Sequence, residues 1–233
     1  MGLTFSSAGS TWLTGSPSES VSDFSVSLWV KATYSSLGSY ARLLDAHYAT
    51  QFWIGKDSNT ARLRFEAKGN AGGGVIVTPA NATWAHLLFT RKSSDGANVV
   101  YLNGTSVNTG TSGTGSFTFN TFRIGANNSN SPGVDKFDGS MCRVTMWNSI
   151  LDSTDANQLG NLKYAGPLVK PGNLIHNWRL LNAPSSGSWT ETDTVGSLTL
   201  TASATGPTTS SDEPSGVLDS LSNRRRRILL GTA

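Results

Sequence analysis

The chain has 233 residues, of which 14% are charged and 37% hydrophobic, a balance that does not indicate disorder driven by high charge. Its formal charge is +3, and Arg224 to Arg227 alone contribute +4, so the remaining residues sum to −1. A near-neutral body excludes the broad basic surface of a general nucleic-acid-binding protein. We therefore predict no nucleic-acid partner.

Cysteine use and apolar runs bear on where the chain is made. Cys142 is the only cysteine, which excludes an intrachain disulfide and fits folding in a reducing compartment. No stretch approaches the ~20 apolar residues of a membrane span, and residues 1–15 lack the apolar core of a signal peptide. We expect assembly in a cytosol, with no membrane partner.

The predicted elements are mostly short strands. In residues 24–31 and 61–68, apolar and polar side chains alternate, and this period of two is typical of strands. Segments rich in Gly, Asn, Ser and Pro separate the candidates. In chain order the predicted strands are 3–7, 24–31, 41–46, 51–55, 61–68, 74–78, 84–91, 97–102, 117–124, 141–147, 174–181 and 197–201.

One hairpin and one helix complete the pattern. In residues 99–110, two extended segments flank Asn103-Gly104, a dipeptide that readily takes the positive φ angles of a tight hairpin turn. Only residues 153–162 read as a helix, with Ser153 as its cap and Gly160 at its end. Many short strands and one helix predict an all-β fold, a two-sheet antiparallel jelly-roll sandwich.

Three stretches resemble a known family. Residues 137–151 (FDGSMCRVTMWNSIL) are similar to the closing strand of laminin-G-like domains, residues 83–105 to their Trp-x-His strand and hairpin, and residues 122–128 to their Ile-Gly strand end. Over residues 24–160 the chain thus resembles a laminin-G-like domain of the concanavalin A-like lectin/glucanase superfamily. The resemblance implies the sandwich and a structural role for His86, but not a function, because this fold hosts lectins, hydrolases and adhesive modules.

The C-terminal third resembles the stretch that usually opens such a module. The matching positions in residues 173–203 are Trp178, Leu180, Asp193, Gly196, Leu198 and Leu200. We interpret this order as a circular permutation, in which residues 174–201 close the core that Leu3 and Phe5 begin. The alternative is an unrelated C-terminal hairpin. The predicted organisation is one sandwich over residues 1–207 and an Arg-rich docking arm over residues 208–233.

The resemblance also bears on catalysis. The glucanase branch implies a Glu-x-Asp-x-x-Glu strand with nucleophile and acid/base on one face. The only similar start is Glu191-Thr192-Asp193, and Gly196 stands where the second Glu would be. No serine-hydrolase elbow, phosphate loop or zinc spacing is present. We predict no catalytic residues and no enzyme; the alternative is a divergent glycoside hydrolase.

Two binding patterns remain. Residues 126–139 supply the hard oxygen ligands that calcium prefers, so this loop is a candidate calcium site. The alternative is a solvated, turn-rich loop, in which case the protein has no cofactor. The calcium candidates are Asn127, Asn128, Asp135 and Asp138. Sugar binding needs an exposed aromatic ring beside polar groups, although most aromatic residues of such a chain belong to its core. The glycan candidates are Tyr34, Tyr40, Tyr48 and Trp53.

The tail carries the functional hypothesis. Four arginines precede an apolar run, which suggests an arm that docks its tip and pairs with acidic groups of another protein or a neighbouring copy. Its residues are Arg224, Arg225, Arg226, Arg227, Ile228, Leu229 and Leu230. The alternative is a disordered basic tail. We hypothesise a non-enzymatic structural or adhesive protein of a bacteriophage virion, a homo-oligomeric capsid decoration or fibre-associated protein that can also bind host glycans. The alternative is a free carbohydrate-binding lectin.

Overall fold

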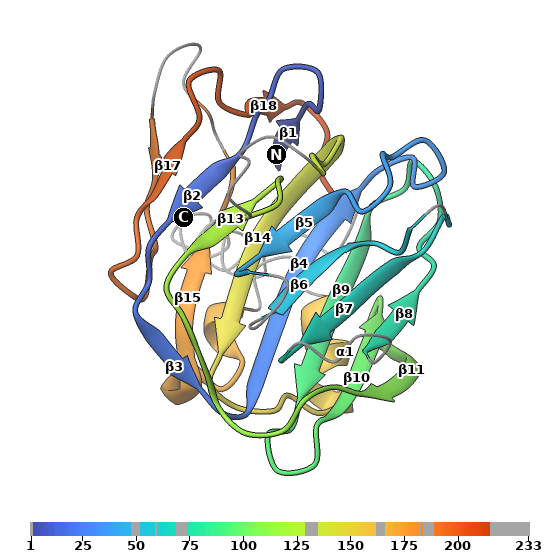
Figure 1. Ribbon diagram of the computed structural model, residues 1–233, viewed down its shortest axis with the longest axis vertical. Coiled ribbons are helices and arrows are strands. Elements are labelled where there is room, and N and C mark those ends of the chain that lie inside the picture. Colours follow the sequence, from blue (N-terminus) through green and yellow to red (C-terminus); the bar gives the residue numbers. More distant parts are fainter. Residues whose placement is uncertain are drawn as a thin grey trace, which may run out of the picture.

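The fold is a sandwich of two antiparallel sheets (Figure 1). A computed structural model describes residues 2–47, 52–58, 60–68, 74–128, 135–161, 166–181, 183 and 189–214. Among these residues each sheet has eight strands, and a two-stranded ladder of β3 (Glu19–Val21) and β12 (Phe117–Phe119) joins one side. The predicted all-β, concanavalin A-like jelly roll is confirmed.

Sheet A forms the back layer in the view of Figure 1. Seven of its strands follow the order β11 (Thr105–Thr111), β10 (Ala97–Leu102), β9 (Ala85–Arg91), β4 (Phe24–Lys31), β14 (Gly139–Trp147), β1 (Gly2–Phe5) and β18 (Thr208–Ser210). The eighth, β15 (Leu174–Trp178), also pairs with β14, along the half that β1 leaves free.

Sheet B forms the front layer of the same view. Its order is β16 (Thr190–Glu191), β17 (Leu200–Ala202), β2 (Leu13–Gly15), β13 (Phe122–Ile124), β5 (Arg42–Asp45), β6 (Phe52–Lys56), β7 (Leu63–Ala67) and β8 (Val75–Val77). The predicted strand 117–124 is therefore two strands, β12 and β13, which pair with different partners.

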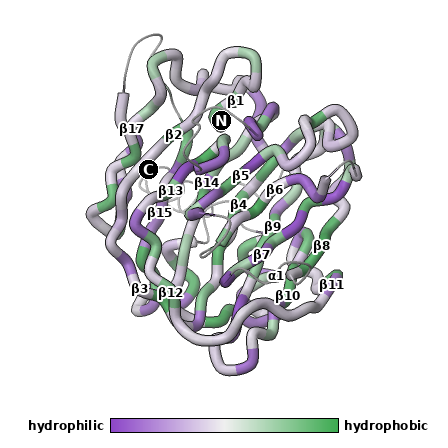
Figure 2. The backbone as a smooth tube through the Cα atoms, in the orientation of Figure 1, coloured by the Kyte–Doolittle hydropathy of each residue, from purple (hydrophilic) through white to green (hydrophobic). Residues whose placement is uncertain are grey.

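The main core lies between the sheets, where alternating side chains such as Phe24, Val26 and Leu28 are buried. Figure 2 shows hydrophobic segments concentrated along the central strands. A second cluster fills the outer face of sheet A, where Leu88, Tyr101 and Trp147 pack beneath α1 (Ser153–Asn161) and Val169. Two short 3-10 helices, Gly166–Leu168 and Pro171–Asn173, follow. The helix thus covers sheet A and leaves the outer face of sheet B without a helical cover in the described part of the chain.

The predicted hairpin and helix are confirmed, with two corrections. Asn103 and Gly104 have φ angles of 50° and 84°, the positive values that the turn requires. The helix is capped by Asp152, whose Oδ1 accepts the backbone N–H of Thr154 at 2.8 Å, and not by Ser153. Gly160 does not end the helix, which extends to Asn161. A Cβ at Gly160 would stand 2.6 Å from the backbone nitrogen of Gly104, so a glycine there lets the helix pack closely on the hairpin turn.

The C-terminal third contributes strands and core residues to the same sandwich. The Trp178 ring stacks on Phe122 at 5.2 Å, and Leu180 and Leu200 lie in the same core as Leu3 and Phe5. Strand β18 pairs with β1, so the predicted boundary at residue 207 is too early and the sandwich continues at least to Ser210. No helix among the described residues is long and apolar enough to cross a membrane.

Candidate functional site

The three predicted glycan aromatics that the structure describes, Tyr34, Tyr40 and Trp53, do not form an open platform. Tyr34 is fully buried in the core, and burial raises the pKa of its hydroxyl. Trp53 is only 5% exposed, whereas Tyr40 is 48% exposed. Tyr48 lies outside the described residues. Tyr34 therefore cannot stack on a ligand, and a ring contact through Trp53 first requires that its cover move.

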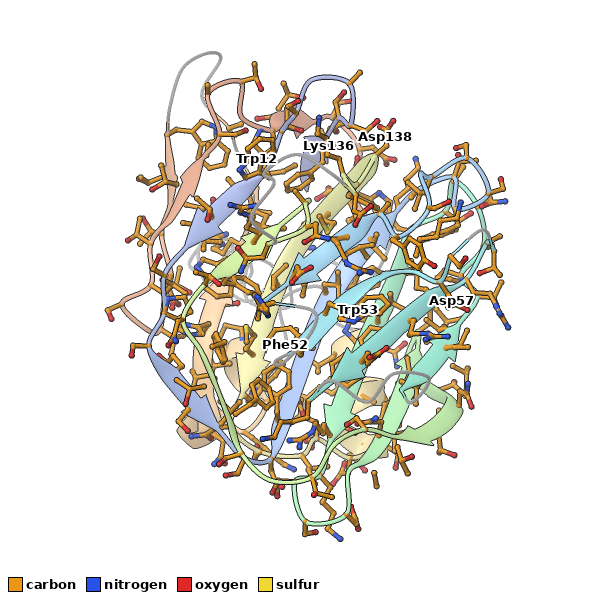
Figure 3. The ribbon with its side chains drawn as sticks, viewed as in Figure 1. Trp12, Phe52, Trp53, Asp57, Lys136 and Asp138 are labelled. Carbon is orange, nitrogen blue, oxygen red and sulfur yellow. The ribbon has the colours of Figure 1, made fainter. Side chains whose placement is uncertain are left out.

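The structure instead gathers charged side chains on the outer face of sheet B. Four neighbouring strands place residues in one register row, Arg123 opposite Asp45, Asp45 opposite Trp53, and Trp53 opposite Glu66. Arg42 and Arg64 lie in the adjacent row, on either side of Gly55. We call this set the sheet B cluster: Arg42, Asp45, Trp53, Arg64, Glu66 and Arg123. Trp53, labelled in Figure 3, marks its place on the sheet nearest the viewer.

Local backbone features bring the cluster together. The register between β5 and β6 shifts between Arg42 and Leu44, and this irregularity turns Arg42 and Asp45 to one face although they are three residues apart. Arg42 Nε then lies 3.3 Å from Asp45 Oδ2. The Arg42 guanidinium lies 3.7 Å from the centre of the Trp53 ring, within cation–π range.

Burial dominates the electrostatics of the cluster. Burial raises the pKa of Asp45, although the His47 backbone N–H and the Arg42 charge act in the opposite direction. Burial likewise raises the pKa of Glu66 and lowers the pKa values of Arg42 and Arg123. Groups shifted in this way, on one face of a rigid sheet, are characteristic of functional sites as well as of structural ion-pair networks.

Several polar atoms of the cluster are buried without a hydrogen-bond partner. The donors are Arg42 Nε and Nη1, Arg64 Nε and Arg123 Nε, and the acceptor is Asp45 Oδ2. Arg42 Nε and Asp45 Oδ2 nevertheless face each other at 3.3 Å as an ion pair. An unmade hydrogen bond of this kind costs roughly 1–3 kcal/mol, and such atoms also occur away from the cluster, for example Arg91 Nε and Tyr34 Oη. Within the cluster, water or a ligand can satisfy them.

Strained backbone flanks the cluster. His47 has a φ of 106°, and its N–H donates to Asp45 Oδ1 at 2.7 Å. Asp135, with a φ of 50°, accepts the Arg42 N–H through its carbonyl at 2.8 Å. Positive φ angles at residues other than glycine are costly, and they collect at functional sites.

The calcium candidates fall into two places. Asn127 Nδ2 donates to Asp135 Oδ2 at 2.8 Å, and the Asn128 backbone contacts Asp45, so three of the four lie beside the sheet B cluster. Asp138 instead accepts a hydrogen bond from Ser7, at 3.3 Å. Calcium wants six to eight oxygen ligands, and the described residues here do not supply them beside the charges of Arg42 and Arg123. Among the described residues, no group of three or more His, Cys, Asp or Glu could hold a metal ion. Calcium binding stays a prediction.

The residues of the glucanase-like stretch make structural hydrogen bonds. Asp193 Oδ2 lies 2.6 Å from His176 Nδ1, and Glu191 Oε1 accepts the Leu180 N–H at 2.9 Å. A Cβ at Gly196 would stand 2.5 Å from Asp193 Oδ2 and 2.6 Å from the Ile175 carbonyl, so no glutamate fits there. Hydrogen bonds thus occupy both carboxylates of the motif, and a second catalytic one has no room at position 196.

His86 fulfils the structural role that the resemblance implies. It is 1% exposed, and its Nε2 lies 2.8 Å from Ser27 Oγ. Burial lowers its pKa to about 3. The predicted docking residues Arg224, Arg225, Arg226, Arg227, Ile228, Leu229 and Leu230 lie outside the described part of the chain.

A comparison with known protein families shows to which superfamily the chain belongs. The model of the concanavalin A-like lectin/glucanases superfamily matches residues 7–157. The chain belongs to this superfamily. The match covers most of the stretch on which the resemblance rests and leaves the closing segment after residue 173 outside it. A comparison with curated proteins finds no match.

Solved structures share this fold. A Bacteroides ovatus protein, provisionally described as carbohydrate-binding, is 18% identical with a TM-score of 0.67. The alignment covers 92% of this chain, which spans 61% of the length of that protein. A heptameric SAP-like pentraxin from Limulus polyphemus is 16% identical with a TM-score of 0.50, over 65% of this chain and 76% of its own. At these identities the likeness shows the fold alone.

The sequence analysis missed most of the sheet B cluster. Two sequence patterns pointed to the cluster. Charged residues occupy alternating positions of 61–68, and Arg42 and Asp45 stand at the two ends of one short apolar run. What joins them is the register of four strands, which a single sequence does not reveal.

Proposed function

We propose that the chain is a non-catalytic carbohydrate-binding module that takes an oligosaccharide across the outer face of sheet B. The observation that carries the proposal is the group of buried polar atoms without a hydrogen bond in the sheet B cluster, namely arginine N–H donors and one Asp45 oxygen that only the ion pair with Arg42 engages. Because these atoms are buried, a ligand reaches them only when the side chains that cover them move. A sugar hydroxyl both donates and accepts, so it complements guanidinium N–H groups and a carboxylate oxygen together. A simple anion would serve only the arginines.

The charge of this face supports a neutral ligand. The cluster holds three arginines and two carboxylates. Asp57 adds a third carboxylate, which pairs with Arg64 at 2.8 Å and with a fourth arginine, Arg62, at 3.0 Å, and Asp135 adds a fourth carboxylate beside Arg42. Charges of both signs therefore balance, and neither an anionic nor a cationic ligand gains from the net field. Arg64, with 24% of its side chain exposed, and the half-buried Arg123 are the groups that a ligand meets first.

The extent of the row supports a chain of several sugar units. Beyond Arg123 the row continues through Thr14 to Thr201 and Thr190, so it crosses seven strands. At about 4.8 Å between strands, the row is roughly 29 Å long. Its outer three members are threonines, of which Thr14 is half-buried and Thr190 and Thr201 are exposed. The provisional description of the Bacteroides ovatus protein as carbohydrate-binding favours the same ligand class.

The test is a screen of the full chain against immobilised glycans, followed by calorimetric titration of the best oligosaccharide. Replacing Arg64 by alanine removes an accessible donor, and we expect affinity to fall by roughly tenfold or more. The matched control is Lys92→Ala, another cation paired with an aspartate, on the turn between β9 and β10. Equal affinities for wild type, Arg64→Ala and Lys92→Ala would contradict the assigned site, and no binding to any glycan would contradict the function.

A lack of catalysis is part of the proposal. The residues of the glucanase-like stretch serve as hydrogen-bond partners, and Gly196 has no room for a side chain. We expect β-glucans, agars and galactans to remain intact in reducing-sugar assays. Sugar release that disappears in Glu191→Gln would overturn this expectation.

The narrower hypothesis is a bacteriophage virion component, attached through Arg224 to Leu230. The observation that favours it is the composition of that segment, four arginines followed by three large aliphatic residues. Virion partners, self-association and a place on the particle belong to this hypothesis. Glycan binding is compatible with it, because a surface copy can engage host glycans.

A further inference from the structure

One side of the sandwich brings an edge strand of each sheet together. Sheet A ends at β11 and sheet B ends at β8, and the two strands lie side by side in Figure 1. Strand β11 has seven residues, and all of them except Gly110 are exposed. An edge strand of this length presents N–H and C=O groups to which a strand of another molecule can pair.

The sequence of β11 lacks the usual protection of such an edge. Residues 105–111 contain no charged residue and no proline, the residue types that most often prevent strand addition. A bulge interrupts the first half, because the register with β10 passes from Asn108 to Ser106 and leaves Val107 as the extra residue. The regular second half, residues 108–111, therefore needs another means of protection.

The pairing with β10 determines which groups of this second half point outward. The Ser112 N–H donates to the Gly96 carbonyl at 2.8 Å, and antiparallel strands alternate between hydrogen-bonded and non-hydrogen-bonded pairs. Counted back from Ser112, Thr111 and Thr109 belong to non-hydrogen-bonded pairs, so their N–H and C=O groups point away from β10. An added strand would use these groups.

Hydrogen bonds between the two sheets occupy this edge. Asn108 Oδ1 accepts the Thr109 N–H at 2.8 Å, and Asn108 Nδ2 donates to the Ile76 carbonyl of β8 at 3.0 Å. The Gly74 N–H, directly before β8, donates to the Thr111 carbonyl at 2.6 Å. One asparagine side chain thus binds the edges of both sheets at once.

Glycine at position 110 lets the two edges approach this closely. A Cβ at Gly110 would stand 2.4 Å from the Gly74 carbonyl and 3.2 Å from Val75 Cγ1. A larger residue there would force β8 and β11 apart. We call the contact between residues 74–76 and residues 108–111 the edge seam.

We propose that Asn108 closes the edge seam against the addition of a strand from a second copy of the chain. In an opened seam, the partner is β11 of that copy, because two identical strands pair antiparallel about a two-fold axis. Such pairing would extend sheet A across two copies through the outward groups of Thr109 and Thr111. The proposal concerns an edge that native copies leave unused, so it is independent of glycan binding and of the C-terminal arm.

Amide hydrogen exchange in the full chain, at low protein concentration, tests whether Asn108 holds the edge. Asn108→Ala removes the acceptor of the Thr109 N–H, and we expect this amide to exchange roughly tenfold faster. The matched control is Asn161→Ala, which removes another exposed asparagine and its hydrogen bond to Asn157, on α1. An unchanged exchange rate of the Thr109 amide in Asn108→Ala would overturn the proposal.

Sedimentation velocity at increasing concentration tests what the edge seam prevents. Asn108→Ala should form dimers or larger species beyond those of the wild type and of Asn161→Ala. Gly110→Val should associate in the same way with Asn108 in place, because its side chain collides with the Gly74 carbonyl. Association of Asn108→Ala equal to that of the wild type overturns the proposal. Should that variant not fold, the same result in Gly110→Val overturns it.

Asn108→Lys separates the hydrogen bonds from the association. A lysine provides no acceptor for the Thr109 N–H but places a charge on the edge, and such charges prevent strand addition. We expect rapid exchange of the Thr109 amide in this variant and association no greater than that of the wild type. Association as strong as that of Asn108→Ala would show that the copies do not meet at β11, which also overturns the proposal.

Discussion

The guanidinium of Arg42 covers the ring of Trp53, with 3.7 Å between its central carbon and the ring centre. The same side chain lies 3.3 Å from Asp45, so one arginine links the aromatic and the carboxylate of the sheet B cluster. This arrangement depends on Gly55, which lies on β6 directly opposite Arg42 on one neighbouring strand and Arg64 on the other. A side chain at that position would occupy the path of Arg42.

Gly55→Ala should therefore disturb both stability and the cluster. A Cβ at Gly55 would stand 2.5 Å from the Ala41 carbonyl and 3.1 Å from Arg42 Cδ, and backbone cannot yield as a side chain can. Overpacking of this kind costs typically about 1–3 kcal/mol in the free energy of unfolding, measured by urea denaturation. Gly38→Ala is the control, because a Cβ there meets nothing within 4 Å. Equal losses in the two variants would contradict this account.

His86 should make the sandwich sensitive to acid. Its pKa is about 3 in the folded protein and near 6.5 in the unfolded chain. Between these values the unfolded state binds one more proton, so the free energy of unfolding falls as the pH falls, by at most about 1.4 kcal/mol per unit. His86→Gln removes this proton but can keep the contact with Ser27.

The measurement for His86 is the slope of unfolding free energy against pH from 6 to 4, in both proteins. We expect a shallower slope in His86→Gln, whatever its absolute stability. Asp193 contributes to both slopes alike, because hydrogen bonds from His176 and backbone N–H groups hold its pKa low despite burial. Parallel slopes would show that the buried imidazole does not govern the acid response.

The closing segment should be indispensable for the fold. Trp178 is fully buried, its ring stacks on Phe122, and its Nε1 donates to the Leu198 carbonyl at 2.9 Å. Trp178→Ala should lower the free energy of unfolding by about 3–5 kcal/mol. A fragment of residues 1–172 lacks β15, β16, β17 and β18 and should not melt cooperatively. A cooperative transition of that fragment at an unchanged temperature would refute closure of the core by residues 174–201.

The C-terminal arm should act in assembly and not in folding. Exposed ion pairs contribute only ~0–1 kcal/mol each, whereas burial of a large aliphatic side chain contributes roughly 1.5–3 kcal/mol. Removing residues 222–233 should leave the melting temperature unchanged and abolish self-association in light scattering. Replacing the four arginines by serine should weaken association in part and reduce its salt dependence. Full association of the truncated chain would make the arm a passive appendage.

The sequence was sufficient for features that depend on nearby residues. Alternation over 24–31 predicted β4 with the bounds that the structure has, and Asn103-Gly104 predicted the turn between β10 and β11. The short strands β2 and β3 escaped prediction, because three residues are too few to show a period. Strand β18 was assigned to the arm, since only its pairing with β1 marks it as part of a sheet.

Candidate sites were harder to predict, because they depend on register and burial. The position of Tyr34 in the sequence suggests a loop, but its side chain is buried in the core. Asp138 was grouped with Asn127 by proximity in the chain, yet its carboxylate accepts a hydrogen bond from Ser7, whereas Asn127 contacts Asp135. The sheet B cluster joins residues as far apart as 42 and 123, which neighbouring strands alone bring together.

The most direct test of the oligosaccharide site is a map of backbone amide shifts in the isotope-labelled full chain, titrated with the glycan that binds best. We predict that the largest shifts fall on β5, β6, β7 and β13, including Asp45, Trp53 and Arg123. Shifts confined to α1 and the outer face of sheet A, or an absence of shifts at saturating glycan, would contradict oligosaccharide binding across sheet B.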